Sequence, residues 1–398
     1  MTRRDFERRV GDARQVFGVE LMEYADGPQR GVRSLEFRTG AGLSFSVLVD
    51  RSMDIGRFDH RGLPMAWQSP TGFRQPQLLD AMDEQGAGFM RGFSGLLCTC
   101  GLDHIRQPDR SAAGHYDLPL RREIHYPMHG RGAFQPATLD GYGLRWEDDE
   151  CWLWCQGTVT QAQVFAENLR LTRRIESRVG DNAIEIVDVV SNHGFSQTPH
   201  MLLYHINVGW PLLDKGARLI APVTEIRSAN MPASIQQSGY RVQAAPTRGY
   251  VQQVFDLGFR AESDGRVPVA LVNDRLALGF GLEFDSKAFR CLQQWQAFGE
   301  GVYGFALEPA TSHWGSRADA EHAGEVIWLQ HLESRTYRSR ISVVEGSDAI
   351  TRLEQRVARI TPQLEDGFAP RTAQRAGGPY IGTLARETSR TATESTNS

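Results

Sequence analysis

Apolar and polar residues alternate with a period of two along much of this chain, and that pattern restricts the fold more than any other feature. Residues 183–190 read Ala-Ile-Glu-Ile-Val-Asp-Val-Val, and residues 169–175 alternate in the same way before the turn sequence at 180–182. Side chains of a strand point alternately to its two faces, so this stretch predicts strand, turn, strand. Similar signals, with β-branched residues where a pleated surface accepts them, recur at residues 43–49, 267–271, 276–284, 302–307, 326–332 and 336–344.

Helical periodicity is scarce. Only residues 76–84 and 348–360 favour short helices, and the chain has no internal repeat of the length that solenoids and propellers show. We therefore expect an all-β protein, a large antiparallel β-sandwich or barrel with a few short helices. We also expect residues 336–344 to pair with residues 326–332.

One domain is predicted over residues 1–365, because no break in composition divides the chain before that point. Residues 366–398 are rich in Arg, Thr, Ser, Ala and Gly and hold few large apolar residues. That composition predicts a disordered tail.

Composition and charge argue against several classes of protein. The chain has 398 residues, 40% of them hydrophobic, which is enough apolar mass to offset the entropy lost on folding. The net charge of −4 and the lack of a long basic run argue against a nucleic-acid partner. No run of 18 apolar residues predicts a membrane span, and the charged N-terminus does not resemble a secretory signal. We expect a cytoplasmic protein with no membrane partner.

Cysteine and lysine usage narrows the chemistry further. The five cysteines lack the two-residue spacing of zinc or thioredoxin-type sites, so we expect reduced, mostly buried thiols. Lys215 and Lys287 are the only lysines. Because Arg stays protonated, a Schiff-base mechanism has only these two candidates.

The Gly-rich segment 88–104 is the first that could bind a ligand. Its glycines permit close backbone approach, and Arg91, Asp103 and His104 lie at its ends. A Gly-kinked strand with a surface Arg–Asp pair is the structural alternative.

The second segment, residues 125–132, places His129 beside Gly130 and Arg131. Imidazole and guanidinium both offer directed N–H donors, which suit hydroxyl-rich or anionic ligands. A metal site is the alternative, because His125 and His129 lie four residues apart, but Pro127 weakens a helical placement of the two.

Two later segments hold the strongest acid–base candidates. His200 and His205 lie five residues apart and would face opposite sides of a strand, so we predict that His200 is structural and that residues 204–207 are the functional half. Glu308 ends an apolar strand just before Pro309. Burial there would raise the pKa of its carboxyl into the range useful for acid–base catalysis. A surface Glu at a strand end is the alternative.

Taken in order, these motifs resemble the aldose 1-epimerase (galactose mutarotase) superfamily, and most closely its bacterial branch of aldose-epimerase-like proteins. The resemblance spans roughly residues 20 to 345. It is carried by residues 47–57, Met128-His129-Gly130-Arg131, Tyr204-His205-Ile206-Asn207 and Leu307-Glu308-Pro309. The resemblance implies a galactose mutarotase-like supersandwich with a sugar-binding cleft on one face.

The resemblance also implies roles for individual residues. His205 matches the general acid that protonates the ring oxygen, and Glu308 matches the base that takes the anomeric hydroxyl proton. His129 matches the histidine that holds the sugar near its ring oxygen. The remaining substrate-binding candidates are Arg91, which matches the family's upstream arginine, and Arg131, Asp103 and Trp210. The family's substrate-binding aspartate has no match, since Asp103 lies too early and Asp214 follows Trp210 too closely.

Opening a hemiacetal ring needs one proton removed and one delivered, and two side chains with pKa values near neutrality suffice. Such groups typically contribute about 10²–10⁴-fold each, so we expect a cofactor-free isomerase acting on a small-molecule carbohydrate, without a metal ion. Trp210 and Trp295 could pack on the apolar face of a sugar, although Trp295 favours a place in the core.

Other interpretations stay open at the level of sequence. One is a sugar-binding or sensing module that lost the reaction. Another is a metal-dependent sugar isomerase or lyase that uses His125, His129, His200 or His205. Arg91 and Arg131 lean toward an anionic sugar, and the oligomeric state is open, a homo-oligomer included.

Three charged residues, Arg51, Asp54 and Arg57, stand close together around one predicted strand. Lone charges in a core are costly, so each is expected to have a partner. We predict that these residues form structural pairs rather than part of the cleft.

Overall fold

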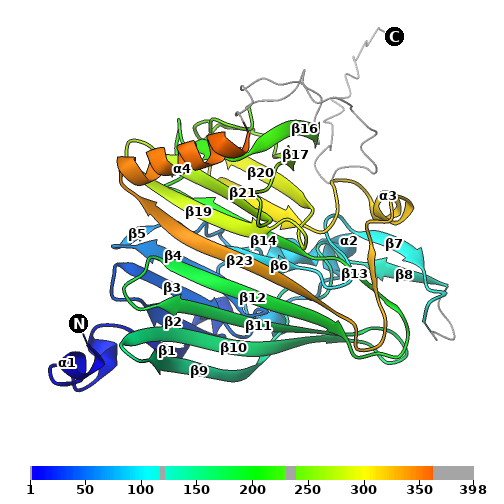
Figure 1. The fold of residues 1–398 in the computed structure, drawn as a ribbon. Coiled ribbons are helices and arrows are strands. Elements are labelled where there is room, and N and C mark those ends of the chain that lie inside the picture. The colour runs from blue at the N-terminus through cyan, green and yellow to red at the C-terminus, as the bar shows by residue number, and fades with distance from the viewer. Residues whose placement is uncertain (1, 117–121, 230–238, 362–398) are drawn as a thin grey trace, which may run out of the picture.

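The computed structural model describes residues 2–116, 122–229 and 239–361, and most of their regular secondary structure lies in antiparallel sheets (Figure 1). The predicted tail at 366–398 lies outside the described residues.

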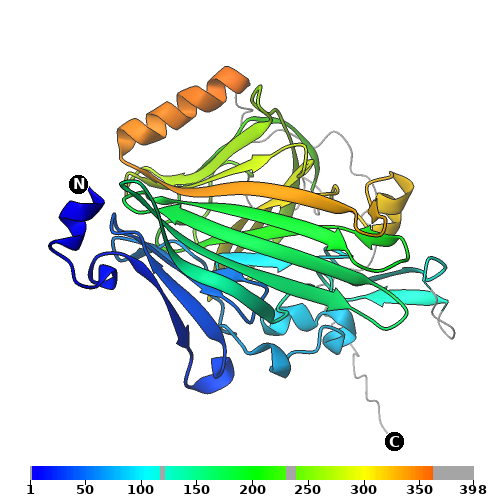
Figure 2. The same cartoon turned by 60° about the horizontal axis from the view of Figure 1, so that its bottom comes forward.

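The largest sheet has eight strands, which run side by side across the molecule in Figure 2. In spatial order they are β15 (Arg218–Ile220), β18 (Arg266–Asn273), β19 (Leu278–Asp285), β23 (Ser334–Glu345), β12 (Ala183–Asn192), β11 (Asn168–Arg178), β10 (Glu150–Ala162) and β9 (Ala137–Glu147). The predicted hairpin is confirmed, because β11 and β12 pair antiparallel, with Leu171 opposite Val190. Burial alternates along β10 and β11, as the period of two requires.

A five-stranded and a six-stranded sheet form the second layer. The five-stranded sheet contains β1 (Gly18–Glu23), β2 (Arg33–Arg38), β3 (Leu43–Leu48), β4 (Asp54–His60) and β5 (Leu63–Pro64). The six-stranded sheet has the order β16 (Val223–Ala229), β17 (Gln253–Phe259), β20 (Cys291–Gly299), β21 (Val302–Ala310), β14 (Leu203–Gly209) and β6 (Leu97–Cys100). The two sheets meet where Leu96, just before β6, donates its backbone N–H to the carbonyl of Gly56 on β4.

The main core fills the space between these layers. One hydrophobic cluster takes Phe45 and Phe58 from the five-stranded sheet, Leu171 from the eight-stranded sheet, and Ile206 and Leu307 from the six-stranded sheet. This continuous packing confirms the all-β sandwich, and it holds β14 and β21 against a rigid support.

The central strands of the six-stranded sheet are buried on their outer face as well. Every residue of β14 is buried, because loops fold back over the sheet with Trp67, Phe89, Phe93 and Met128 in a second apolar cluster. The sequence of a strand that is covered on both faces is a nearly continuous apolar run and does not alternate.

The predicted structural pairing of the three clustered charges is confirmed. Asp54 is buried, accepts the backbone N–H of Thr99 at 3.0 Å, and lies 3.1 Å from the guanidinium of Arg173. Buried Arg51 donates to backbone carbonyls, among them that of Arg74 at 3.2 Å. Arg57 pairs with Glu36 at 2.9 Å near the surface.

One local prediction, the pairing of residues 336–344 with residues 326–332, is wrong. The segment at 336–344 lies in β23, which pairs with β12 and β19. The upstream segment contributes β22 (Ile327–Leu329), which pairs with β13 (Thr198–His200) instead. The sequence pattern shows where β23 lies but not that it pairs with β12 and β19, which are distant in sequence. The short helices predicted near residues 76–84 are present as two single turns, η3 (Pro76–Leu78) and α2 (Asp83–Gly86).

The remaining elements are short or lie at the edges. α4 (Ser347–Ile360) confirms the predicted C-terminal helix and buries Ile350 and Val357 against β15 and β18. A small sheet joins β7 (Asp109–Ala112) to β8 (Glu123–Tyr126). The other helices are α1 (Arg3–Glu7), α2 (Asp83–Gly86) and α3 (Arg317–His322), and the 3₁₀ turns are η1 (Ala13–Gln15), η2 (Gly27–Gln29), η3 (Pro76–Leu78) and η4 (Gly88–Arg91).

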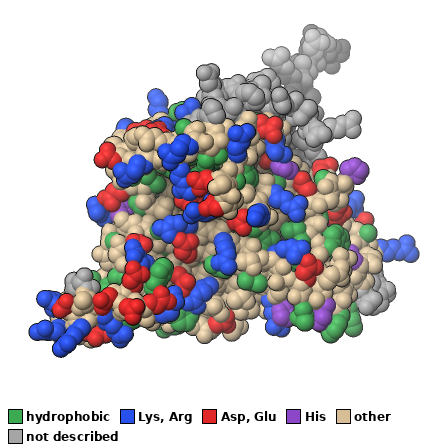
Figure 3. Space-filling model, in the orientation of Figure 1, with side chains coloured by type: hydrophobic (Ala, Val, Ile, Leu, Met, Phe, Trp, Pro, Cys, Tyr) green, Lys and Arg blue, Asp and Glu red, His purple; other side chains and the backbone are tan. Residues whose placement is uncertain are grey.

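Acidic and basic side chains are interspersed over the face drawn in Figure 3. All five cysteine thiols are free and buried, as expected. Within the described residues, no helix has both the length and the apolar character needed to cross a bilayer.

Candidate functional site

His205 and Glu308 meet on the outer face of the six-stranded sheet. His205 lies on β14 and Glu308 on β21, and the register pairs Leu203–Ala310 and Ile206–Leu307 place the two side by side on neighbouring strands. The Nε2 atom of His205 is 3.3 Å from Oε1 of Glu308. Two strands separated by about a hundred residues of chain therefore bring an imidazole and a carboxyl into contact, as the resemblance implied.

Asn207 fixes which nitrogen of His205 carries a proton. Its amide nitrogen donates to the carbonyls of Gly95 and His205, both at 3.0 Å, so its Oδ1 must face the imidazole. That oxygen lies 2.5 Å from His205 Nδ1, which therefore donates. Nε2 is left as the atom that faces Glu308. Burial lowers the pKa of His205 to about 3, so the ring is neutral at physiological pH.

Burial favours the protonated form of Glu308, whereas it favours the deprotonated form of His205. Burial raises the pKa of its carboxyl from 4.5 to about 8, and the nearby guanidinium of Arg106 holds that value down. The approach of Glu308 Oε1 to His205 is close but not aligned as a hydrogen bond, so this oxygen has no hydrogen-bond partner among the described residues. At neutral pH His205 Nε2 and the Glu308 carboxyl therefore hold one proton between them, and that proton is on Glu308.

His129 approaches the pair from the loop after β8. Its ring lies edge-on to His205 with 5.8 Å between centroids. The backbone N–H of Arg106 donates to Nδ1 of His129 at 3.3 Å, so the ring proton is on Nε2. Burial holds the pKa of His129 well below its ordinary value. His129 is therefore a neutral N–H donor beside the pair.

Arg106 is a site residue that the sequence did not single out. It is buried, adopts a positive φ of 74°, and donates to Ser312 Oγ at 2.9 Å. Its Nε has no hydrogen-bond partner among the described residues. The neighbouring residues Asp103 and His104 drew attention in the sequence, but a loop that turns back over a sheet leaves no periodic signal for its central residue.

Gln293 and Asp256 extend the site across the sheet. Gln293 on β20 lies directly opposite Glu308, and Asp256 on β17 lies directly opposite Gln293. With His205 they form one row over four neighbouring strands, which we call the polar row. An Asp inside the apolar run 254–257 was a usable signal, since its charge has to be explained by a partner or a ligand.

Aromatic side chains cover the pair. The ring of Phe93 lies 4.7 Å from that of His205, and Trp295 packs edge-on at 5.4 Å. As a result the side chains of His205 and Glu308 are only 6% and 4% exposed. Trp295 is buried, in line with its predicted place in the core.

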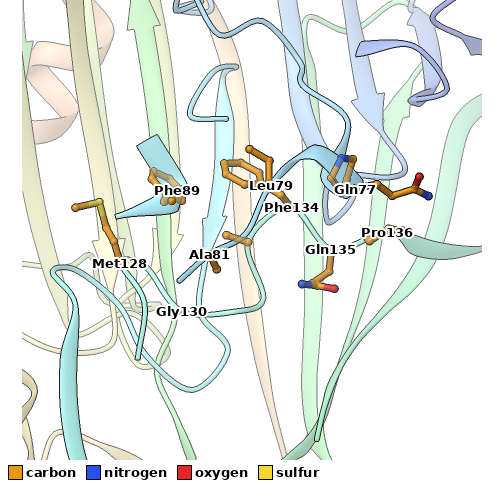
Figure 4. Close-up of a pocket in the computed structure, with 12 residues that line it drawn as sticks. Gln77, Leu79, Ala81, Phe89, Met128, Gly130, Phe134, Gln135 and Pro136 are labelled. Carbon is orange, nitrogen blue, oxygen red and sulfur yellow. The ribbon is translucent and has the colours of Figure 1, made fainter. Parts of the chain in front are cut away.

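A pocket of about 190 Å³ opens beside the site (Figure 4). Phe89 and Phe134 line it, together with Met128 and Gly130, the two neighbours of His129 in sequence. The ring of Phe89 also packs against His129 at 4.7 Å. The pocket thus shares a wall with His129, but neither His205 nor Glu308 lines it.

The structure does not bring all predicted binding residues to the pair. Arg91 is 62% exposed on η4 and pairs with Glu84. Trp210 is 67% exposed beyond the end of β14. Arg131 lies 3.8 Å from buried Asp103, so these two residues pair with each other. Because Arg91 and Arg131 both have acidic partners, they no longer argue for an anionic sugar.

Of the four histidines proposed as metal ligands, only His129 and His205 lie close together. His200 is buried on β13 and hydrogen-bonds the Leu102 carbonyl at 2.7 Å and the Tyr337 hydroxyl at 2.6 Å, which confirms its structural role. His125 is 63% exposed on β8. Among the residues the structure describes, no cluster of three or more His, Cys, Asp or Glu side chains could hold a metal ion.

Comparisons with known proteins agree with this architecture. A family model described as "Domain of unknown function (DUF4432)" matches residues 29–343. No curated protein matches the sequence.

Three solved structures resemble the chain. A candidate aldose 1-epimerase from Klebsiella pneumoniae subsp. pneumoniae MGH 78578 is 22% identical with a TM-score of 0.79, covering 89% of this chain and 91% of that one. A galactose mutarotase-like protein from Clostridium acetobutylicum is 12% identical with a TM-score of 0.54, covering 83% and 99%. A candidate aldose 1-epimerase from Escherichia coli K12 is 15% identical with a TM-score of 0.50, covering 76% and 96%. These likenesses establish a galactose mutarotase-like fold.

Proposed function

This chain belongs to the family described as Domain of unknown function (DUF4432), and we propose that it is an aldose 1-epimerase, an isomerase that interconverts the α and β anomers of a sugar. The observation that carries the proposal is the 3.3 Å approach of His205 Nε2 to Glu308 Oε1 on a mutarotase-like sheet. A buried Glu often serves as one half of a structural ion pair. That role fits Glu308 less well, because its Oε1 atom lacks an aligned hydrogen bond within the described residues.

The proposed chemistry needs only side chains. Anomerisation opens the ring when a base takes the proton of the anomeric hydroxyl and an acid delivers one to the ring oxygen. Rotation about the C1–C2 bond and closure on the other face of the aldehyde then reverse the two transfers. The His205–Glu308 pair, with one proton for two sites, can supply both functions and ends the cycle in its starting state.

The resting protonation suggests an order of events. Glu308 holds the proton and His205 Nε2 presents a lone pair, so the Glu308 carboxyl is ready to donate and the imidazole to accept. The resemblance assigns these roles the other way round. The two assignments differ only by the position of one proton between atoms 3.3 Å apart, and they share one pH dependence because the pair titrates as a unit.

Unpartnered polar atoms around Glu308 support a hydroxyl-rich ligand. Arg106 Nε, Gln293 Oε1 and Glu308 Oε1 are buried and lack hydrogen bonds within the described residues. Leaving such atoms unpaired costs about 1–3 kcal/mol each. Sugar hydroxyls donate and accept at once, so a sugar would partner the Arg106 donor and the Gln293 acceptor together. His129 Nε2–H would add a donor near the ring oxygen.

Access to the pair is part of the proposal. Because His205 and Glu308 are 6% and 4% exposed, a sugar reaches them only when covering groups such as the Phe93 ring move. The same burial favours a second candidate, a sugar-binding module in which ligand occupies the pocket beside His129 without reacting. The two functions differ in turnover, not in binding.

Replacing Glu308 with Gln tests the proposal. The amide keeps the size of the side chain but cannot exchange the proton, so catalysed anomerisation should fall by about 10²–10⁴-fold, while sugar binding persists. Polarimetry or NMR on freshly dissolved single anomers of a panel of aldoses measures the rate. Glu185→Gln, a change at a half-exposed residue of β12, is the matched control. Wild-type protein that binds sugars yet leaves every anomerisation rate at the buffer value would support the binding module instead.

A further inference from the structure

A second polar centre lies at the far end of the polar row from His205. Asp256 on β17 is 2% exposed, and its Oδ2 accepts the backbone N–H of Trp314 at 3.0 Å. The same oxygen lies 3.0 Å from Nδ1 of His313, the third residue after β21. The strand that carries Glu308 therefore continues into a segment whose imidazole is anchored on a buried carboxylate.

The orientation of the His313 ring follows from these contacts. A carboxylate can only accept, so Nδ1 carries the proton and Nε2 presents the lone pair. The guanidinium of Arg227 on β16 donates to that Nε2 at 3.2 Å. The His313 side chain is 30% exposed, far more than either His205 or Glu308. The polar row thus ends in an oriented imidazole that a ligand can reach.

The spacing suits one sugar ring. Neighbouring strands lie about 4.8 Å apart, so Asp256, two strands from Glu308 across Gln293, stands about 10 Å away. A pyranose about 5 Å across, with a hydrogen bond of about 2.8 Å at each end, has a comparable length. A ring with its anomeric carbon at Glu308 would direct its C4 and C6 substituents toward His313.

The charges around His313 select the kind of substituent. The His313 backbone N–H donates to Glu325 at 2.9 Å, and the guanidinium of Arg227 lies 3.3 Å from Glu225. Together with Asp256, the carboxylates outnumber the Arg227 cation. An added phosphate or carboxylate would be repelled there. A neutral hydroxyl could insert between the two groups, donating to the imidazole lone pair that Arg227 now occupies and accepting from the released guanidinium N–H.

We infer that His313, positioned by Asp256, binds a hydroxyl at the C4–C6 end of a neutral aldohexose and thereby selects the substrate by its far hydroxyls. This inference rests on the proposed function, because the direction of the sugar is set by placing its anomeric carbon at Glu308. His313 is a substrate-binding residue here, and Asp256 acts through it.

The test compares sugars that differ only at the far end. D-Galactose, D-glucose and 6-deoxy-D-galactose differ at C4 or at C6, and kcat/KM for anomerisation is measured for each. We expect the wild-type protein to favour one hexose over its C4 epimer or its 6-deoxy analogue by roughly tenfold, the value of one hydrogen bond. His313→Ala should reduce that ratio to near one, and His313→Gln, which keeps a donor for Asp256 and an acceptor for the ligand, should restore part of it.

Controls separate selectivity from folding. His322→Ala, at an exposed residue of α3, should leave the ratio unchanged. A fall in kcat/KM by the same factor for all three sugars in His313→Ala, with no change in their ratio, would overturn the inference, as would a wild-type protein that does not discriminate.

A binding experiment distinguishes this inference from the proposed function. The same sugars are titrated into Glu308→Gln and into Glu308→Gln/His313→Ala by calorimetry. Discrimination that depends on His313 in these variants would uphold the inference. The epimerase proposal would be defeated separately, if the wild-type protein bound these sugars without turning over any of them. Absence of binding of all three sugars to Glu308→Gln and to the wild-type protein would defeat the inference.

Discussion

Tyr204 and His205 are neighbours on β14, and their side chains serve opposite faces of the sheet. The Tyr204 hydroxyl donates to Asp188 in the core between the layers, whereas His205 Nε2 lies 3.3 Å from Glu308 on the outer face. The acid–base pair is thus one residue away from a buried ionic network. The strand that presents the imidazole is fixed from behind, so the geometry of the pair depends on packing as well as on its own contacts.

The pH dependence of the reaction follows from the single proton of the pair. Burial raises the pKa of Glu308 to about 8 and lowers that of His205 to about 3. The one-proton form therefore prevails between these values, and catalysed anomerisation should fall as pH rises above about 8. The measurement is kcat/KM against pH at constant ionic strength, with the buffer rate subtracted. A catalysed rate that climbs through pH 8 would mean that the pair works without its proton, contrary to the proposed chemistry.

Stability should depend on pH with a sign set by Glu308. Its folded-state pKa is raised from 4.5 to about 8, so its contribution to stability is complete below pH 4.5 and is lost as pH rises through 8. His205, lowered from 6.5 to about 3, acts in the opposite direction, but only below pH 6.5.

Between pH 6.5 and 9, therefore, Glu308 alone of the pair should make the wild-type protein lose about 2 kcal/mol of unfolding free energy. Glu308→Gln has no such proton to lose and should show a flatter profile. Urea unfolding at the two pH values gives the difference between the proteins. Parallel profiles for wild type and Glu308→Gln would show that the carboxyl does not titrate in this range.

Access to the pair can be measured directly. The Phe93 ring is 4.7 Å from the His205 ring and buries it, so Phe93→Ala should raise the rate at which diethyl pyrocarbonate modifies His205 at least several-fold. Peptide mass spectrometry follows the modification, with exposed His322 as an internal reference. The variant loses about 3–5 kcal/mol of stability, so the reaction is run well below its melting temperature. An unchanged rate would identify other groups as the cover.

Sequence reasoning succeeded where one face of a strand is polar. The hairpin β11–β12 is visible because Ile184 and Ile186 alternate with solvent-facing residues on a half-exposed sheet. β17 and β20 show no such alternation in sequence, because both faces of these strands are covered. Pairing partners of β23 could not be foreseen, since a period of two reports which face is buried and not which strand lies beside it.

Some residues of the candidate site can likewise be recognised in the sequence, and others cannot. His205 and Glu308 stand out because a charged or titratable residue in an apolar run needs a reason, and the structure puts them in contact. Arg91 and Trp210 sit in equally suggestive segments but point to solvent. Arg106 and Gln293 carry no motif. A loop that folds over the sheet brings Arg106 to Glu308, and the pairing of β20 with β21 brings Gln293 there.

The network behind β14 gives the sharpest stability test. The guanidinium of Arg173 is completely buried and lies 2.6 Å from Asp188 and 3.1 Å from Asp54. Removing this cation leaves two buried carboxyls without their charge partner, and burial already raises the pKa of Asp54 to about 6. Arg173→Met should therefore cost about 3–5 kcal/mol of unfolding free energy.

Arg174, the next residue on β11, is the matched control, because its side chain is 31% exposed and pairs with Glu176 near the surface. Arg174→Met should cost less than about 1 kcal/mol. Because Tyr204 shares Asp188 with Arg173, Arg173→Met should also slow anomerisation at temperatures where the variant is fully folded, through displacement of β14 and of His205. Equal losses of stability for the two variants in urea unfolding would show that the network contributes no more than a surface pair, and the rigid support assigned to His205 would then lie elsewhere.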